Sequence, residues 1–406
     1  MRILLVTNYF EPDSGAAAVR LTRLAYLLQE RGHQLTILTS LPHYPQGRIH
    51  QGYRRRWTVV ENRKGLRVIQ TSLWATPSHR ISRKFLSQLS FMLTAILRGL
   101  FIPRPDVLLI EGQPVFTAIA GVFLARLKRR PYVLNVSDLW PDHLLSVGAV
   151  TEQSRVYRLA RWLVDSMYRG AAGIVAMSPA WARAIEGHIG PTDKLSVIYN
   201  GVDLTRFHPD VDTTAFRAQH GLNADKIVAF IGTFATQYDF EMMLEVTRYL
   251  KDEATVLLVG QGSQADYVRQ RIDAGGLEHL RWLEWVEHAE MPAVWNTATL
   301  TFWAMRDHPL YQGTIPAKLY EALACGTPII ASMSGEGATM IEASGAGVVV
   351  PVGDAQALIA AIRKILNDDA LQQQLRYAGR AYAEAHFDPV KVAEAYELIL
   401  SKVHKT

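Results

Sequence analysis

The chain has 406 residues, of which 49% are hydrophobic and 20% charged, with a formal net charge of +5. This length exceeds one ordinary hydrophobic core and favours two or three domains, while the composition excludes a disordered or low-complexity protein. The single cysteine, Cys325, excludes an intramolecular disulfide framework and a cysteine-based zinc site, which is typical of a reducing compartment.

Positive charge is concentrated in the first half of the chain. Residues 1–195 hold 26 Lys and Arg against 12 Asp and Glu, whereas residues 196–406 hold 17 against 26. The stretches 52–57, 80–86 and 126–131 place basic residues beside aromatic or apolar ones, which favours contact with an anionic membrane surface. A plain solvated face stays open as an alternative. Nucleic acid is disfavoured as a partner because no helix-turn-helix, RNP or zinc-finger signature is found.

Two apolar stretches bear on where the protein is located. The first ten residues lack the long apolar core and the cleavage site of a signal peptide, which predicts a cytoplasmic protein. Residues 85–103 approach membrane-spanning length, but Ser87, Gln88, Ser90 and Arg98 interrupt them. That pattern favours a buried or interfacial helix over a transmembrane one. We therefore expect peripheral association with the inner face of the cell membrane.

The elements predicted in the first half alternate between strand and helix. Residues 2–7 predict a strand, 15–29 an amphipathic helix that begins after Asp13 or Ser14, and 34–40 a second strand. Helical stretches separate most of the later strands, which are predicted at 68–71, 107–110, 132–136, 173–177 and 196–199. An order of strand, helix and strand indicates a parallel sheet.

The alternation starts again after a polar span around 203–212. Strands are predicted at 226–231, 255–259, 280–283, 300–303, 327–331 and 347–350, and a last helix at 390–403. The fold class is therefore α/β, with doubly wound domains at 1–195 and 226–386, a hinge or linker at 196–225 and a final helical segment at 387–406. Ligands bind such sheets at the carboxyl ends of the strands, so we expect the chemistry in those loops.

The loop after the first predicted strand, "TNYFEPDSGAAAV", differs from a dinucleotide-binding loop. It lacks the G-x-G-x-x-G pattern, and no acidic residue closes the second strand, which disfavours a nicotinamide-dependent dehydrogenase. Ser14, Gly15 and Ala16 are small and open a helix, so their amides can approach an anion. A simple tight turn is an equally good interpretation.

Three loops of the second half share features of anion sites. Gly232 and Thr233 follow the strand at 226–231, and Gly260 follows the strand at 255–259. The third is "YQGTIPAKLYEALACGTPIIAS", where Thr314 is a candidate N-cap, Pro316 suits a first helical turn and Gly326 suits the C′ position.

Lys318 lies in the first turn of this predicted helix, where a cation is mildly unfavourable unless an anion binds. Glu321 follows three residues later, so both side chains can face one cleft. The alternative interpretation is an ordinary exposed ion pair, which would contribute little. The coincidence of three anion-compatible loops on one sheet favours a phosphate site.

Metal and nucleophile motifs are scarce in the sequence. One D-x-D pattern, Asp210–Asp212, lies in the expected linker, and we do not expect it to bind metal. The sequence holds neither an H-E-x-x-H motif nor a G-x-S-x-G nucleophile elbow. Metalloproteases and α/β-hydrolases are therefore excluded.

Several of these segments, in this order, resemble the family-4 retaining glycosyltransferases of GT-B fold over nearly the whole chain. The resemblance is carried by the first 40 residues and by "VSDLWPD", "VIYNGVDLTRFHPD", "IGTFATQYDF" and "TIPAKLYEALACGTPII". The segments around "LPHYPQGRIHQGYRRRW" and "DLWPD" look most like bacterial polysaccharide enzymes, such as colanic acid glycosyltransferases and O-antigen N-acetyl-fucosaminyl transferases. The resemblance implies two Rossmann-like domains that face a central cleft, with the final helix crossing back to the first domain.

The resemblance also implies residues that bind a nucleotide-sugar donor without a metal or another cofactor. Glu321 matches the second acidic residue of the family's E-x7-E motif, which binds the ribose. The first acidic position is Gly313 here, so the amides of Thr314 and Ile315 are candidates to hold the sugar instead. The loop 234–239 lacks the basic pair found in many members. Lys318 is then the candidate for the diphosphate, alongside the glycines of the strand-end loops.

Candidate acceptor residues lie in the first domain. Asp138 stands near the position where many relatives have a histidine, and it could orient or deprotonate an acceptor hydroxyl. A cap of a helix at 139–145 is an equally good interpretation of Asp138. His43 and Tyr44 in "LPHYPQ" and Trp140 in "DLWPD" are candidates to contact the acceptor.

Together the residues and the resemblance predict a retaining transferase in bacterial surface polysaccharide synthesis. It would move a hexosyl or N-acetylhexosaminyl-type sugar from a nucleotide sugar, expected to be a UDP-sugar, to a lipid-linked or oligosaccharide acceptor. Two alternatives stay open. One is a nucleotide-sugar epimerase or sugar-phosphate synthase on the same fold, and the other is a non-catalytic nucleotide-sugar-binding subunit, which the glycine at 313 raises.

Overall fold

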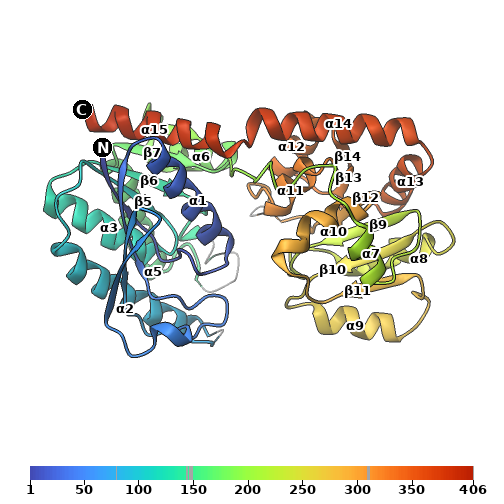
Figure 1. Cartoon of the computed structure of the whole chain (residues 1–406), viewed down its shortest axis with the longest axis horizontal. Coiled ribbons are helices and arrows are strands. Elements are labelled where there is room, and N and C mark those ends of the chain that lie inside the picture. The colour runs from blue at the N-terminus through green and yellow to red at the C-terminus, as the bar shows by residue number, and fades with distance from the viewer. Residues whose placement is uncertain (79, 143–144, 146–149, 309–310, 406) are drawn as a thin grey trace. The chain divides into compact units, whose positions relative to one another are not determined.

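The computed structural model describes residues 1–78, 80–142, 145, 150–308 and 311–405. Two compact units are formed, one by residues 1–200 with 389–406 and the other by residues 201–388. Figure 1 shows the elements of each unit. The second unit is therefore inserted, in sequence, between two parts of the first.

The first unit is built on a sheet of order β3-β4-β2-β1-β5-β6-β7-β8. All pairs are parallel except β3 with β4. Its strands are β1 (Arg2–Val6), β2 (Gln34–Ser40), β3 (Thr58–Arg63), β4 (Leu66–Thr71), β5 (Val107–Glu111), β6 (Tyr132–Val136), β7 (Gly173–Ala176) and β8 (Leu195–Val197). Its helices are α1 (Ala16–Glu30), α2 (Ile81–Leu100), α3 (Val115–Lys128), α5 (Arg155–Gly170), α6 (Pro179–Ile189) and α15 (Pro389–Lys405).

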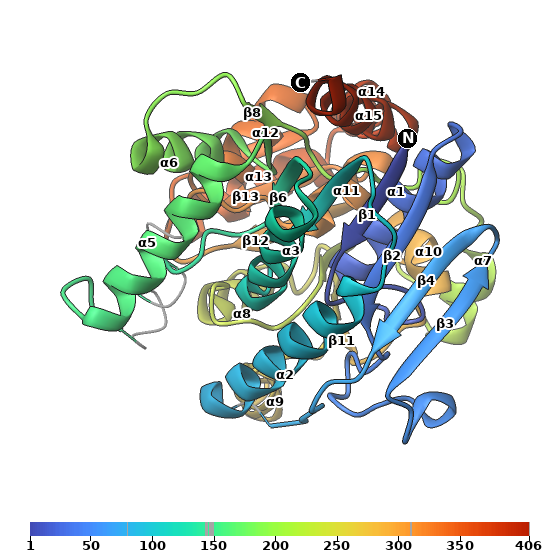
Figure 2. The ribbon, with the colours of Figure 1, turned by 90° about the vertical axis from the view of Figure 1, so that its left-hand side faces the viewer.

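Helices cover both faces of this sheet, and the strand sequences show why. Successive strand residues point to opposite faces, so a strand buried on both sides must be apolar throughout. In β1, Ile3 and Leu5 pack in the core beneath α1 and α15, whereas Leu4 and Val6 pack beneath α2, α3, α5 and α6. Figure 2 shows α2 and α3, which contact each other.

The hairpin of β3 and β4 was not anticipated, because only 68–71 was expected as a strand. Lys64 and Gly65 form its tight turn, with φ of 46° and 92°. Positive φ at both central residues matches the twist of a hairpin. The Asn62 side chain closes the turn by accepting the Gly65 N–H at 2.9 Å.

The segment expected as an interfacial or buried helix is largely α2. Phe91 and Ala95 are buried in the core, whereas Leu93 and Leu97 are about half exposed. Among the described residues, no helix is long and apolar enough to span a membrane.

The second unit has a parallel sheet of order β11-β10-β9-β12-β13-β14. Its strands are β9 (Ile227–Ile231), β10 (Thr255–Val259), β11 (Leu280–Leu283), β12 (Leu300–Ala304), β13 (Ile329–Ser332) and β14 (Gly347–Val350). Its helices are α7 (Thr214–Gln219), α8 (Phe240–Tyr249), α9 (Ala265–Asp273), α10 (Met291–Thr297), α11 (Ala317–Ala324), α12 (Glu336–Ser344), α13 (Ala355–Leu366) and α14 (Asp369–His386).

The span 196–225, expected as a hinge or linker, is mostly part of the two units. Its first residues belong to β8 of the first sheet, and residues from Gly201 onward belong to the second unit. The Val202 N–H donates to the Phe387 carbonyl at 3.0 Å, and α7 lies within the span. The polar composition of 203–212 therefore reflects a surface segment that packs on its own unit.

Candidate functional site

The strand order of the second sheet defines one edge where a ligand can bind. From β9 the chain proceeds outward through β10 and β11, whereas β12, β13 and β14 proceed in the other direction. Parallel sheets bind ligands at such a switch in strand order, beyond the carboxyl ends of the strands. Gly232 and Thr233 follow β9 directly at this edge, and α11 is the helix after β12.

Lys318 is buried at this edge, and its amine has no hydrogen-bond partner in the ranges that the structure describes. Its side chain leaves the first turn of α11, and the residue is only 9% exposed. The Nζ atom lies 3.8 Å from the ring centroid of Phe230, 4.1 Å from that of Tyr238 and 4.8 Å from that of Trp303. No hydrogen-bond acceptor satisfies this Nζ among the described residues. The alternative of an exposed Lys318–Glu321 ion pair is therefore wrong.

The aromatic rings compensate only part of the cost of burying a cation. Ring faces attract an ammonium group, but the attraction falls well short of a full counter-charge. Burial accordingly lowers the pKa of Lys318 well below its ordinary value. A lysine in this state is poised to gain a proton when an anion arrives. Sequence reasoning identified Lys318 but missed these rings, which come from three separate segments.

Glycines keep the space beside Lys318 open. Gly232 adopts a φ of 139°, and a Cβ atom added to it would lie 3.6 Å from the lysine Nζ. Gly260, with φ of 136°, packs so tightly that an added Cβ would lie 2.0 Å from the Gly232 carbonyl oxygen. The turns after β9 and β10 therefore require glycine and bring their backbones together. Thr233 is exposed at the tip of the first turn.

Glu321 is held one helical turn beyond Lys318. Its Oε2 accepts a hydrogen bond of 2.9 Å from the indole Nε1–H of Trp295, which is completely buried in α10. Burial raises the pKa of Glu321, and the hydrogen bond from Trp295 opposes this rise. The bond fixes the orientation of the carboxyl group.

The segment before α11 differs in one respect from the expectation. Thr314 was expected to cap the helix, but α11 begins at Ala317 and Pro316 occupies the N-cap position without a side-chain hydrogen bond. The reason is that Pro316 is extended, with ψ of 133°, and a proline also disfavours helical geometry in the residue before it. Gly313 is buried, and Thr314 and Ile315 are half-buried in the loop at the same sheet edge. Gly326 ends the helix with a φ of 63°, as expected.

Two residues after β13 adjoin this loop and were missed by the sequence reasoning. The Glu336 N–H donates to the Gln312 carbonyl at 2.7 Å. A Cβ added to Gly335, whose φ is 82°, would lie 2.1 Å from that same carbonyl oxygen. The available signal was a glycine directly before a helix and after a buried strand.

Candidate acceptor residues gather at the carboxyl ends of β1 and β2 in the first unit. Asp13, which is 5% exposed, accepts backbone N–H bonds of 2.9 Å from both His43 and Tyr44. The His43 ring stacks on Tyr9 at a centroid distance of 5.4 Å. Desolvation raises the pKa of Asp13 and lowers that of His43. A Cβ on Gly15 would lie 3.0 Å from the Tyr44 ring, so close packing favours a small residue here, and a contact of Gly15 with the donor stays a prediction.

Asp138 and Trp140 lie at the end of β6, two strands away from β1 in the same sheet. The Asp138 Oδ1 accepts the Leu139 N–H at 2.9 Å, and the Gln113 side chain donates to the Asp138 carbonyl at 3.4 Å. Trp140 is half-buried against the core. The helix expected at 139–145 falls partly outside the described residues, which leaves both interpretations of Asp138 open.

A buried polar network supports this edge of the first sheet. Glu111, at the end of β5, accepts bonds from the side chains of Arg20 at 2.9 Å, Asn135 at 2.6 Å and Ser137 at 2.5 Å. The Tyr396 hydroxyl of α15 donates to Asn135 Oδ1 at 2.6 Å. The network joins the C-terminal helix to residues beside Asp138, and sequence reasoning missed it.

The D-x-D pattern, Asp210–Asp212, lies in the second unit shortly before α7. The Asp212 carboxylate accepts the Thr214 N–H at 2.9 Å. Within the described ranges, no group of three or more His, Cys, Asp or Glu residues is arranged to hold a metal ion.

Comparisons with known proteins match both units of the chain to glycosyltransferase domains. The family described as "Glycosyl transferase 4-like domain" matches residues 15–201, and "Glycosyl transferases group 1" matches residues 212–382. The chain is 22% identical to the colanic acid biosynthesis glycosyl transferase WcaI of Escherichia coli K12, over 98% of each chain. It is 23% identical to the glycosyltransferase WbjE of Pseudomonas aeruginosa, over 66% of this chain and 67% of that one.

Solved structures show the same fold. The sucrose-phosphate synthase of Thermosynechococcus elongatus superposes with a TM-score of 0.77 at 19% identity, covering 99% of this chain and 98% of that one. HepE of Anabaena, in complex with UDP, superposes with a TM-score of 0.73 at 19% identity, covering 99% and 100%. Two α/β domains of this kind form the GT-B fold.

The chain belongs to the GT-B glycosyltransferases that join a glycosyl transferase 4-like domain to a group 1 glycosyl transferase domain.

Proposed function

We propose that the protein transfers a sugar, with retention of configuration, from a UDP-sugar to a lipid-linked or oligosaccharide acceptor. The donor half of this proposal rests on the Nζ of Lys318 at the switch in strand order, which has no hydrogen-bond partner among the residues described. A diphosphate bound there supplies the counter-charge that the aromatic surroundings lack. The complex of HepE with UDP supports a uridine nucleotide as the donor group.

The remaining donor contacts follow from the geometry at the same edge. Gly232 lies beside the lysine, but its N–H already donates to the Val259 carbonyl at 2.9 Å. The N–H of Thr233, the next residue, is therefore the candidate to bind the diphosphate. Glu321, oriented by Trp295, is the candidate to accept hydrogen bonds from the ribose hydroxyls. The loop Gly313 to Ile315 is the candidate to bind the sugar, in place of the carboxylate found in relatives.

Catalysis in this proposal rests mainly on electrostatic stabilisation. As the bond between the sugar and the diphosphate breaks, negative charge grows on the leaving phosphate, and a protonated Lys318 stabilises it more strongly than it stabilises the intact donor. The leaving phosphate can then take the proton of the attacking acceptor hydroxyl on the same face of the sugar. Asp138 is proposed to orient that hydroxyl, with His43, Tyr44 and Trp140 contacting the acceptor.

A surface of α2 and α3 supports the membrane part of the proposal. Leu93, Leu97 and Phe101, which follow one another by about one helical turn, are 52%, 55% and 77% exposed. Phe123 and Leu127, on α3 beside them, are 48% and 56% exposed. Basic residues from the same two helices and their ends, Arg98, Arg126, Arg129 and Arg130, add the charge that anionic lipids attract.

The catalytic proposal is tested with purified protein, UDP-, GDP-, ADP- and TDP-sugars, and polyprenyl-diphosphate acceptors. We expect turnover with a UDP-sugar only when an acceptor is present, and a loss of at least a hundredfold in Lys318→Met. Arg363→Gln is a matched control, because Arg363 pairs with Glu253 away from this edge. Equal turnover in Lys318→Met would refute the site, and tight UDP binding without transfer to any acceptor would favour a non-catalytic subunit.

The membrane proposal is tested by co-sedimentation with vesicles. We expect binding to vesicles rich in phosphatidylglycerol and little binding to phosphatidylcholine alone. Leu97→Asp with Phe101→Asp should abolish it, whereas Leu398→Asp, at a 72% exposed site on α15, should not. Equal binding by both variants would contradict the assignment of this surface.

A further inference from the structure

The second unit has a polar cavity at the amino-terminal ends of its strands, on the side of the sheet opposite to the proposed donor site. The cavity measures about 690 Å³, a size typical of pockets for small molecules. Its lining includes Asp225 and Lys226, which directly precede β9, and Ala298 and Thr299, which directly precede β12. It therefore lies at the amino ends of the strands whose carboxyl ends adjoin Lys318. The cavity takes no part in the proposed donor site.

Three cations in the cavity lack an ionic partner in the described part of the second unit. Arg217 donates from Nη2 to the Ala224 carbonyl at 2.5 Å, and Arg376 donates to the Pro209 carbonyl at 3.5 Å. The Lys226 Nζ donates to the side-chain oxygen of Asn367 at 2.9 Å. Carbonyl partners orient a cation without neutralising it. None of the three forms an ion pair within the described residues.

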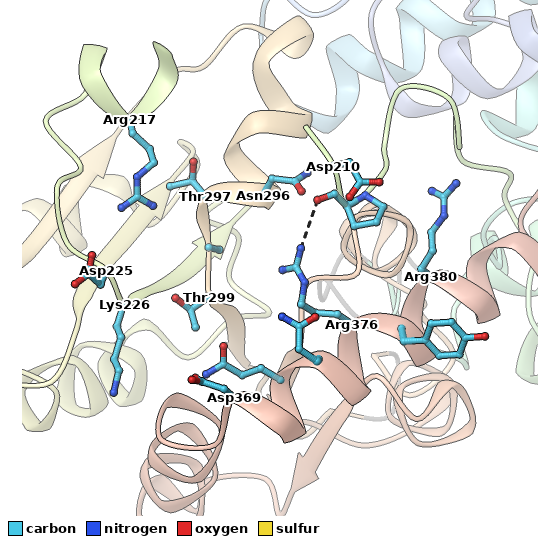
Figure 3. Close-up of a pocket in the computed structure, with 15 residues that line it drawn as sticks. Asp210, Arg217, Asp225, Lys226, Asn296, Thr297, Thr299, Asp369, Arg376 and Arg380 are labelled. Carbon is cyan, nitrogen blue, oxygen red and sulfur yellow. Dashed lines mark hydrogen bonds between the residues drawn. The ribbon is translucent and has the colours of Figure 1, made fainter. Parts of the chain in front are cut away.

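Acidic and uncharged polar groups line the same space. Asp225 and Asp369 belong to the wall, yet neither is paired with the three cations in the described part of the chain. The Thr297 hydroxyl oxygen is buried and has no hydrogen-bond partner among the described residues. The Asn296 side-chain amide donates to the His208 and Pro292 carbonyls. In Figure 3, Arg217 and Arg376 lie apart from each other, with Asp225 on the side of Arg217.

Such a lining matches a ligand of mixed chemistry. Unpaired cations attract an anion, and guanidinium groups match phosphate or carboxylate geometry. Carboxylates, amides and hydroxyls instead accept or donate hydrogen bonds to alcohol groups. An inorganic anion alone would form no hydrogen bonds with the carboxylates. A neutral sugar alone would leave the cations without a counter-charge. A sugar that bears an anionic group satisfies both sets.

We propose that this cavity binds a small anionic sugar, with its phosphate or carboxylate at either Arg217 or Arg376 and its hydroxyls at Asp225 and Asp369. The site is separate from the donor site, and its occupation does not depend on the proposed transfer reaction. The proposed ligand is a sugar, as is the group that a glycosyltransferase transfers.

The test is isothermal titration calorimetry of the full chain with four probes: glucose 1-phosphate, glucuronate, glucose and inorganic phosphate. Saturating UDP is present throughout, so that the donor site is already occupied. We expect glucose 1-phosphate or glucuronate to bind at least tenfold more tightly than glucose or phosphate, and comparison of the first two identifies the anionic group. Binding of phosphate as tight as that of both sugar anions would overturn the proposal.

Variants then locate the binding. Arg217→Gln with Arg376→Gln should weaken the binding at least tenfold, whereas Arg363→Gln, outside the cavity, should leave it unchanged. Gln373→Trp is a second, independent variant, because Gln373 is an exposed helix residue that lines the cavity and a larger side chain there fills it without disturbing the core. Lys318→Met should retain the binding, which separates this proposal from the donor site. Unchanged binding in both cavity variants would refute the site.

Discussion

Binding of UDP should cause the protein to take up protons, and Lys318 should be the group that takes them up. Its Nζ is buried among Phe230, Tyr238 and Trp303, with no hydrogen-bond partner in the described part of the chain, and burial lowers its pKa. If the diphosphate binds beside this atom, the charged form of the lysine becomes favourable again. The pKa of Lys318 must then rise on binding.

The size of the effect follows from the distance between the charges. A unit positive charge about 4 Å from a unit negative charge gains about 4 kcal/mol at an effective dielectric constant of about 20. This corresponds to an affinity on the order of a thousandfold higher for the protonated lysine than for the neutral one. Proton uptake should therefore rise toward one per UDP in the pH window between the pKa of the free site and that of the complex.

The assay is calorimetry of UDP binding in pairs of buffers with different ionisation enthalpies, repeated from pH 7.5 to 9.5. In this range the phosphate groups of UDP are fully ionised, since the second phosphate pKa is about 6. The observed enthalpy should depend on the buffer in the wild type, and the affinity should fall as the pH rises. Lys318→Met keeps the volume of the side chain and removes the titrating group.

Two outcomes would refute the reasoning. The first is a binding enthalpy of the wild type that does not depend on the buffer. The second is equal proton uptake in the wild type and in Lys318→Met. Either would show that the diphosphate does not bind next to this lysine.

Three further predictions concern other parts of the two units. Glu321→Gln should weaken UDP binding at least tenfold in calorimetry while keeping the bond from Trp295, and unchanged affinity would exclude Glu321 as the ribose ligand. Tyr396→Phe removes a buried hydroxyl from Asn135 and should lower the free energy of unfolding by about 1–3 kcal/mol in urea titrations, whereas Tyr377→Phe, at a 79% exposed site, should leave it unchanged. Burial lowers the pKa of His43, so below about pH 6.5 the unfolded chain binds a proton at this histidine that the folded chain does not bind. The free energy of unfolding should therefore fall from pH 7 to 5.5, and it should fall by less in His43→Asn. Equal pH slopes for the wild type and the variant would contradict this.

Much of the architecture was predictable because each buried strand is a short apolar run next to a helical pattern. This is why the strands of the second sheet were expected close to where they lie. The hairpin of β3 and β4 was missed because solvent-facing residues of β3 interrupt its apolar pattern. A Lys-Gly turn with an asparagine two residues before it is also a weaker signal than Asn-Gly.

The candidate site was predictable only where its residues share one local segment. Lys318 and Glu321 lie on one short helix, so their common side followed from helical spacing. The rings around the lysine come from β9, β12 and the loop after β9, and only the folded sheet brings them together. The error at Thr314 has a local cause, because the preference of threonine for an N-cap was weaker than the backbone restriction that Pro316 imposes.

The position of α15 has a consequence for the order of events during synthesis. Ala393, Tyr396, Leu400 and Val403 complete the core on one face of the first sheet, yet the whole second unit is translated before them. Chains fold as they emerge, so the part of this face that α15 covers stays exposed, beside α1, while residues 201–388 are made. We infer that an interrupted chain ending before Pro389 would expose this face and would be a preferred substrate for chaperones and proteases.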